Sequence, residues 1–90
     1  MDEIALHDKQ ERGSQAEELL RNELMQEAFK VVHAEYVSEW LRTDAKDTQG
    51  RERLWQAVRS LGQIELHIRK VARDGKLASK DLATIKYLKR

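Results

Sequence analysis

The sequence contains no cysteine and no proline, and only four of its 90 residues are glycine. Without cysteine, the chain forms no disulfide, no thiolate zinc site and no cysteine nucleophile. Without proline, it lacks the residue that most strongly interrupts a helix. Aromatic residues are also few: two tryptophans, two tyrosines and one phenylalanine.

Long apolar runs are missing as well. No segment approaches the roughly 20 apolar residues that cross a bilayer. The first residues lack the basic-then-apolar layout of a secretion signal. We therefore expect a protein that is neither secreted nor inserted in a membrane, and that stays in the compartment where it is made.

What the chain has is helix-forming sequence with a high charge content. Hydrophobic residues make up 40% and charged residues 37% of the chain. This composition is typical of helices with solvated outer faces. A folded chain of this length buries only about 60% of the surface that it exposes when unfolded, so a partner subunit would add to its stability.

Charge changes sign along the chain. Residues 1–44 carry eleven Asp/Glu and five Lys/Arg, a net charge of −6. Residues 45–66 carry three and four, or +1, and residues 67–90 carry two and eight, or +6. Such asymmetry marks either an interaction surface or two segments of one fold that attract each other.

The first helical region is expected to follow a flexible arm over residues 1–13. Ser14 and Glu17 have the spacing of a capping box, in which each side chain bonds the other's backbone amide. Apolar residues then recur at steps of three and four as far as Arg42. Asn22 can either sit within one long helix or cap a second one, and the second alternative gives helices over 15–21 and 23–42.

A second long helix is expected after a short connection at residues 43–48. Asp47 or Thr48 serves as its N-cap, and its apolar stripe extends from Leu54 to Ala72. A connection this short between long helices favours an antiparallel hairpin. The helix is expected over 49–73.

Gly75 follows a cationic last turn, which is the pattern of a left-handed glycine that ends a helix. A last short helix is then expected over 79–88. The predicted fold is all-α, with a long antiparallel helical hairpin and short flanking helices at each end. Residues 14–90 are expected to form a single domain.

No group of residues indicates catalysis, a metal site or a cofactor site. His33 and His67 have no second His or carboxylate at helical chelating distance, and His7, with Glu3 and Glu11 four residues away, falls in the segment expected to be a flexible arm. Carboxylate pairs such as Glu35 and Glu39 lie on or beside a polar helix face, where general acid or base catalysis has no cleft to act in. We expect no enzyme activity, no metal and no cofactor.

Contacts with other molecules are expected at two sets of residues. Trp55 and Leu66 lie off the apolar stripe; Trp55 either packs over Trp40 and Leu41 at the turn or anchors an interface, where Trp is enriched. The positive charge at the end of the chain forms a second, electrostatic contact. The predicted interface residues are Trp55, Leu66, Lys80, Lys86, Lys89 and Arg90.

Part of the sequence resembles a group of small helical proteins encoded by tailed bacteriophages of proteobacteria. The resemblance covers about two-thirds of the chain, mainly the string Glu27-Ala28-Phe29, Glu35-Tyr36-Val37 with Trp40, residues 47–55 (DTQGRERLW) and residues 74–78 (DGKLA). It implies a phage origin and a place among virion-assembly proteins. It implies no catalytic residue.

These observations together favour a non-enzymatic bacteriophage protein that acts by protein–protein association. We expect a homo-oligomeric accessory of virion assembly or structure, located in the cytoplasm of the infected host or in the virion. Its partners would be further copies of itself or a capsid, portal or other phage protein. Two alternatives are a DNA-binding accessory that uses the basic C-terminal segment and an inhibitor that binds one host protein.

Overall fold

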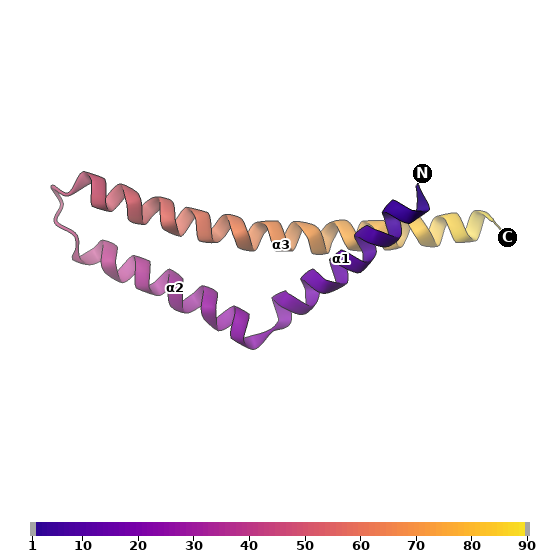
Figure 1. Ribbon diagram of the computed structural model, residues 1–90, viewed down its shortest axis with the longest axis horizontal. Coiled ribbons are helices and arrows are strands. Elements are labelled where there is room, and N and C mark those ends of the chain that lie inside the picture. The colour runs from indigo at the N-terminus through magenta and orange to yellow at the C-terminus, as the bar shows by residue number, and fades with distance from the viewer. Residues whose placement is uncertain (1, 90) are drawn as a thin grey trace. The chain divides into compact units, whose positions relative to one another are not determined.

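Helices are the only regular secondary structure in residues 2–89, the part of the chain that this computed structural model describes. They are α1 (Glu3–Arg21), α2 (Glu23–Arg42) and α3 (Thr48–Leu88), as Figure 1 shows. The predicted all-α class is therefore confirmed. None of these helices is both long and apolar enough to span a membrane.

Two helix boundaries agree with the sequence pattern. Asn22 has an extended backbone, and its side chain accepts a hydrogen bond of 2.9 Å from the amide of Met25. It is thus the N-cap of α2, which settles the question of one helix or two. At the start of α3, the amide of Gly50 donates a 2.9 Å hydrogen bond to Asp47 Oδ1, so Asp47 caps this helix.

Two other boundary predictions are wrong. Gly75 does not end a helix, because α3 continues through it to Leu88 and no described glycine has a positive φ. The separate helices expected over 49–73 and 79–88 are therefore one. Residues 3–13, expected as part of a flexible arm, are the first half of α1, and Ser14 lies inside that helix instead of capping it.

The chain divides into two compact units. The crossing unit consists of residues 2–21 and 67–89, that is, α1 with the C-terminal half of α3. The turn unit consists of residues 22–66, that is, α2, the connection and the N-terminal half of α3.

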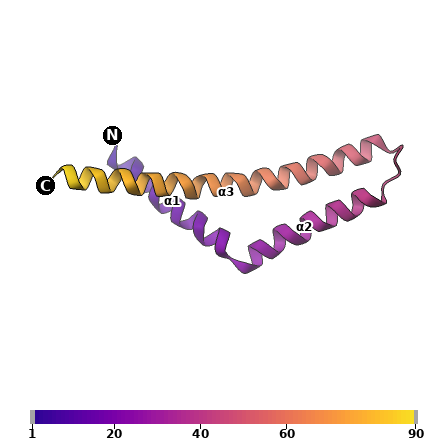
Figure 2. The same cartoon turned by 180° about the vertical axis from the view of Figure 1, so that it is seen from behind.

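In the crossing unit, α1 passes across α3 at two glycines (Figures 1 and 2). A Cβ atom added to Gly13 would lie 2.6 Å from the Cα of Gly75, and the converse distance is also 2.6 Å. Only glycine allows two backbones to approach so closely. The buried residues of this unit are Leu6, Gly13, Ala16, Ala72, Gly75 and Ala78.

The turn unit is held at its connection by polar and cation–π contacts. Arg51 donates a 3.0 Å hydrogen bond to Thr43 Oγ1, and its guanidinium lies 3.9 Å from the centre of the Trp40 ring. The amide of Asp47 donates to the carbonyl of Asp44 at 2.9 Å, which closes the turn. These contacts fix the end of α2 against the beginning of α3.

Burial along the turn unit is incomplete. In α2, the half-buried apolar side chains are Met25, Phe29, Val32 and Tyr36. In α3 they are Leu54, Ala57, Val58 and Leu61. Ile64, expected in the same inward stripe, is instead exposed, as are Leu24 and Leu41 of the α2 stripe. No residue of α2 is fully buried.

The cap at Asn22 leads to a first prediction. Asn22→Ala removes the side-chain acceptor for the amide of Met25, and we expect the free energy of unfolding to fall by about 1 kcal/mol. Asn22→Asp keeps the acceptor and serves as the matched control. Urea unfolding followed by circular dichroism measures both; equal stability of the Ala and Asp variants would contradict the role of the cap.

Candidate interaction surfaces

Two of the predicted interface residues, Trp55 and Leu66, lie in the turn unit. They are 52% and 66% exposed. They are eleven positions apart in the sequence, which is close to three helical turns and places both on one side of α3. The guanidinium of Arg59 lies 5.4 Å from the centre of the Trp55 ring, so this indole packs against a surface side chain.

Further apolar side chains are exposed on α2. Leu24 and Leu41, near the two ends of this helix, are 73% and 70% exposed. Val31 and Val37 are exposed to a lesser degree. Isolated apolar residues on a surface are common, but a helix without one buried residue lacks the packing that holds most protein helices in place.

The total exposed surface of the chain is also larger than that of an average folded monomer of its mass. The chain has a mass of 10.5 kDa and exposes 7440 Å². A folded monomer of this mass exposes about 5400 Å² on average. The excess of about 2000 Å² is comparable with the area that a stable protein–protein interface removes from water.

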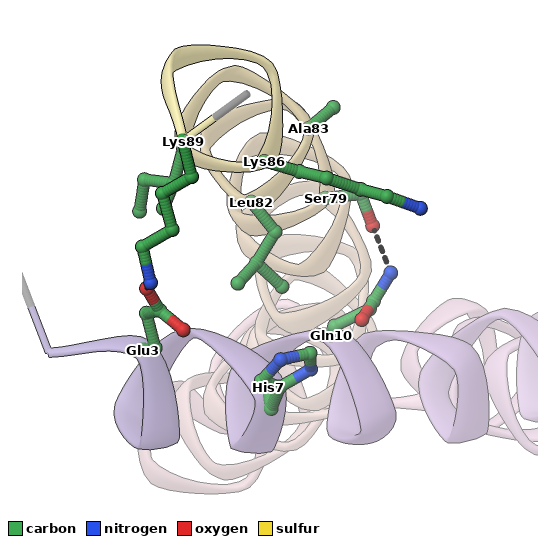
Figure 3. A pocket seen from close by; sticks show the side chains of 9 residues that line it. Glu3, His7, Gln10, Ser79, Leu82, Ala83, Lys86 and Lys89 are labelled. Atoms are coloured by element: carbon green, nitrogen blue, oxygen red, sulfur yellow. Dashed lines mark hydrogen bonds and ion pairs between the residues drawn. The ribbon is translucent and has the colours of Figure 1, made fainter.

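Three of the predicted cationic residues, Lys80, Lys86 and Lys89, lie in the crossing unit and have different surroundings. Lys89 pairs with Glu3 across the two helices, and Lys86 lines the same hollow (Figure 3). Gln10 donates a 2.9 Å hydrogen bond to Ser79 Oγ in that hollow. Lys80 is exposed, and Arg90 lies outside the described residues.

The pair of Glu3 and Lys89 has an electrostatic consequence. The hydrogen bond and the positive charge of Lys89 lower the pKa of Glu3 below its ordinary value. The pKa of Glu3 is lower in the folded chain than in the unfolded chain. The pair therefore stabilises the fold at a pH above the pKa that Glu3 has in the unfolded chain. This stabilisation is lost as the pH falls through the pKa that Glu3 has in the folded chain.

A titration tests this pair. We expect NMR to show a lower titration midpoint for the Glu3 carboxyl in the wild-type chain than in Lys89→Gln, because the variant removes both the hydrogen bond and the charge. Lys86→Gln is the control, since it neutralises a cation of the same hollow that does not bond Glu3. Equal midpoints in the wild-type chain and Lys89→Gln would contradict the pairing.

Two further hollows of the crossing unit are lined mainly by basic side chains that the sequence analysis did not select. One lies between Lys9 and Arg12 of α1 and His67 and Lys70 of α3. The other contains Arg21 of α1 with three cations of α3, described further below. Their charges converge because α1 crosses α3, which brings residues far apart in sequence to the same place.

The glycine crossing was also missed at the sequence level, although a signal existed. Small residues recur at a spacing of three in both segments, as Gly13 with Ala16 and as Ala72 with Gly75 and Ala78. This spacing places them on one side of each helix. Because this spacing of small residues continues through Gly75, it could have indicated a glycine packed inside a helix instead of a glycine that ends one.

Within residues 2–89 there is no group of three or more His, Asp or Glu side chains placed to hold a metal ion. The hollows of the crossing unit are open to solvent; Lys, Arg and Glu make up most of the lining in one of them and half or less in the other two. Comparison of the chain with models of protein families, with curated proteins and with solved structures found no match. The surfaces of the molecule are therefore the features that bear on its function.

Proposed function

We propose that this protein acts by association, without enzyme activity, and that the turn unit is its self-association module. In this proposal α2 and the N-terminal half of α3 pack as an antiparallel hairpin. Two such hairpins, from two copies of the chain, then bury their apolar surfaces against each other. Trp55 and Leu66 are the proposed apolar anchors.

The observation that carries this proposal is the absence of any buried residue in α2. Five large apolar side chains of α2 and of the part of α3 in the turn unit are more than half exposed: Leu24, Leu41, Trp55, Ile64 and Leu66. Exposed apolar surface is a driving force for association, worth roughly 25 cal/mol for each Å² removed from water. A helix in this state is stabilised when a partner covers it.

A second copy of the chain is the partner that the numbers favour. Each copy exposes about 2000 Å² more than an average monomer of its mass. Burial of about 800 Å² per copy is enough for a standard interface, so the exposed area of each copy suffices for a symmetric dimer. Two hairpins packed together give a four-helix bundle, a common arrangement for paired helical hairpins.

Phage virion assembly is the biological setting that we propose for this module. Support comes from the sequence string described above, which includes residues 47–55 at the turn and residues 74–78 in the crossing unit. A small self-associating helical protein is suited to an accessory role, in which copies contact one another and a capsid or portal component.

Analytical ultracentrifugation over a range of protein concentrations tests the proposal. We expect a reversible increase in mass with concentration, at both low and high salt, because apolar burial is little weakened by salt. Association that disappears at high salt would place the contact on the charged residues instead. A strict monomer at all concentrations would refute self-association altogether.

A further inference from the structure

The strongest unassigned feature of the molecule is a basic hollow at the C-terminal end of α1, which we call the cationic hollow. It lies wholly within the crossing unit and has a volume of about 500 Å³. Leu20 and Ala72 contribute apolar surface to it. Its charged residues are Glu17, Arg21, Arg69, Arg73 and Lys76, four cations and one carboxylate.

The cations continue along α3 beyond the hollow. Arg69, Arg73, Lys76 and Lys80 follow one another at steps of four, three and four residues. This spacing places all four on one side of the helix, over a length of roughly 16 Å. All four residues are exposed. The result is a line of positive charge, with Arg21 beside it.

Glu17 already supplies one anion to the hollow. Its carboxylate lies 3.6 Å from Lys76 Nζ. An ion pair of this kind, with the lysine side chain mostly exposed, contributes at most about 1 kcal/mol, so a stronger anion can displace it. The exposed Glu11 and Glu18 lie on the other side of α1 from Gly13 and do not line the hollow.

We propose that the cationic hollow and Lys80 bind the phosphate backbone of a nucleic acid. Arginine presents a planar fork of donors that matches a phosphate group, and the hollow has three of them. A linear polyanion fits a line of cations along one helix.

This site concerns the crossing unit and stands apart from association through the turn unit. It also differs from a contact through the last residues, because Lys89 is paired with Glu3. The proposed contacts are to backbone phosphates, with no side chain placed to read bases. Binding is therefore expected to be independent of sequence and strongly dependent on salt.

Fluorescence anisotropy with a short labelled DNA duplex tests the proposal. With five cations engaged, we expect the slope of log affinity against log salt to be about −4.5. Arg73→Gln combined with Lys80→Gln is expected to lower the affinity about 50-fold at 0.1 M salt and to reduce the slope by about two. Glu17→Gln removes the competing carboxylate and is expected to raise the affinity about fivefold.

The matched control is Lys30→Gln combined with Arg53→Gln, which changes the net charge equally but alters two exposed residues of the turn unit. We expect this control to retain most of the wild-type affinity. An equal loss in both double variants would show that only net charge matters and would overturn the site. Failure of the wild-type chain to bind the duplex at about 50 mM salt would overturn it as well.

A second outcome separates the proposal from its nearest rival, an acidic protein surface. If Arg73→Gln with Lys80→Gln weakens self-association while the wild-type chain ignores the duplex, the hollow receives acidic residues of another copy. The nucleic-acid proposal then fails, although association remains. Thermal unfolding of each variant by circular dichroism confirms that the altered residues, all on the surface, leave the fold intact.

Discussion

Gly75→Ala is expected to lower the free energy of unfolding by about 2 to 3 kcal/mol, although alanine is the better helix former. A methyl group at Gly75 would lie 2.6 Å from the Cα of Gly13 and 3.0 Å from the carbonyl oxygen of Lys9. Both contacts are with backbone, which cannot rotate away, so the two helices must separate. Overpacking of this kind costs about 1 to 3 kcal/mol or more.

The matched control is Gly62→Ala in the same helix. A Cβ atom at Gly62 meets nothing within 4 Å, so this change is expected to stabilise the chain by about 0.5 to 1 kcal/mol. Urea unfolding of both variants, at dilute concentration where association does not contribute, gives the comparison. Stability gains of similar size at both positions would show that no close crossing exists.

A substitution at Gly13, the other glycine of the crossing, tests the same contact from the facing helix. Gly13→Ala places a methyl group in the same gap from the other side, also 2.6 Å from the facing Cα. We expect a loss similar to that of Gly75→Ala. The double variant is expected to lose less than the sum of the two, since the first methyl group already separates the helices. Additive losses would indicate two independent sites.

Trp55→Ser combined with Leu66→Ser is expected to raise the dissociation constant of self-association at least about 100-fold. Tryptophan at the centre of an interface commonly contributes about 2 kcal/mol or more. In a symmetric dimer each substitution is present twice, which doubles its effect. The fold of the single chain should change little, because both side chains are largely exposed in it.

Ile4→Ser combined with Leu88→Ser is the control for this experiment. Both residues are exposed apolar side chains, and both belong to the crossing unit. We expect the control to associate like the wild-type chain in sedimentation equilibrium. Unchanged association of the Trp55 and Leu66 variant would remove these residues from the interface. A similar loss in both variants would point to general surface hydrophobicity instead of a defined contact.

Agreement between sequence and structure is best where the signal is local. The capping role of Asn22 and the start of α3 after Asp47 depend on side chains that bond amides three residues away. Such bonds need only neighbouring residues, although the equally local pattern of Ser14 and Glu17 does not cap a helix in this chain. Disagreement is greatest at Gly75, where a cationic turn followed by glycine has the pattern of a helix end, yet the helix continues.

The case of Gly75 has a clear physical reason. Because glycine has no Cβ, it allows either a left-handed backbone conformation or a close approach of two backbones. Its neighbours in sequence cannot distinguish these roles, because the approaching group, Gly13, lies 62 residues away along the chain. The same limit applies to α1: residues 3–13 look like a polar arm alone, but burial of Leu6 in the crossing unit gives that segment a reason to be helical.

A count of charges along the sequence predicts only part of the cationic hollow. Eight Lys and Arg in residues 67–90 mark this segment as basic from the sequence alone. Their distribution over separate hollows was not predictable from that count. Lys89 is paired with Glu3, while Lys76 faces Glu17 beside Arg21. These differences arise only because α1 crosses α3 at a particular angle and register.

The sequence by itself determined the helical class, the connection that follows Arg42 and the direction of the charge gradient. All of these depend on residues within a few positions of one another, where backbone geometry restricts the possibilities. Only the tertiary structure decided that Gly75 joins two halves of one helix and that Arg21 meets the basic side of α3. Contacts between distant segments depend on which surfaces are buried together, and a single sequence does not specify that choice locally.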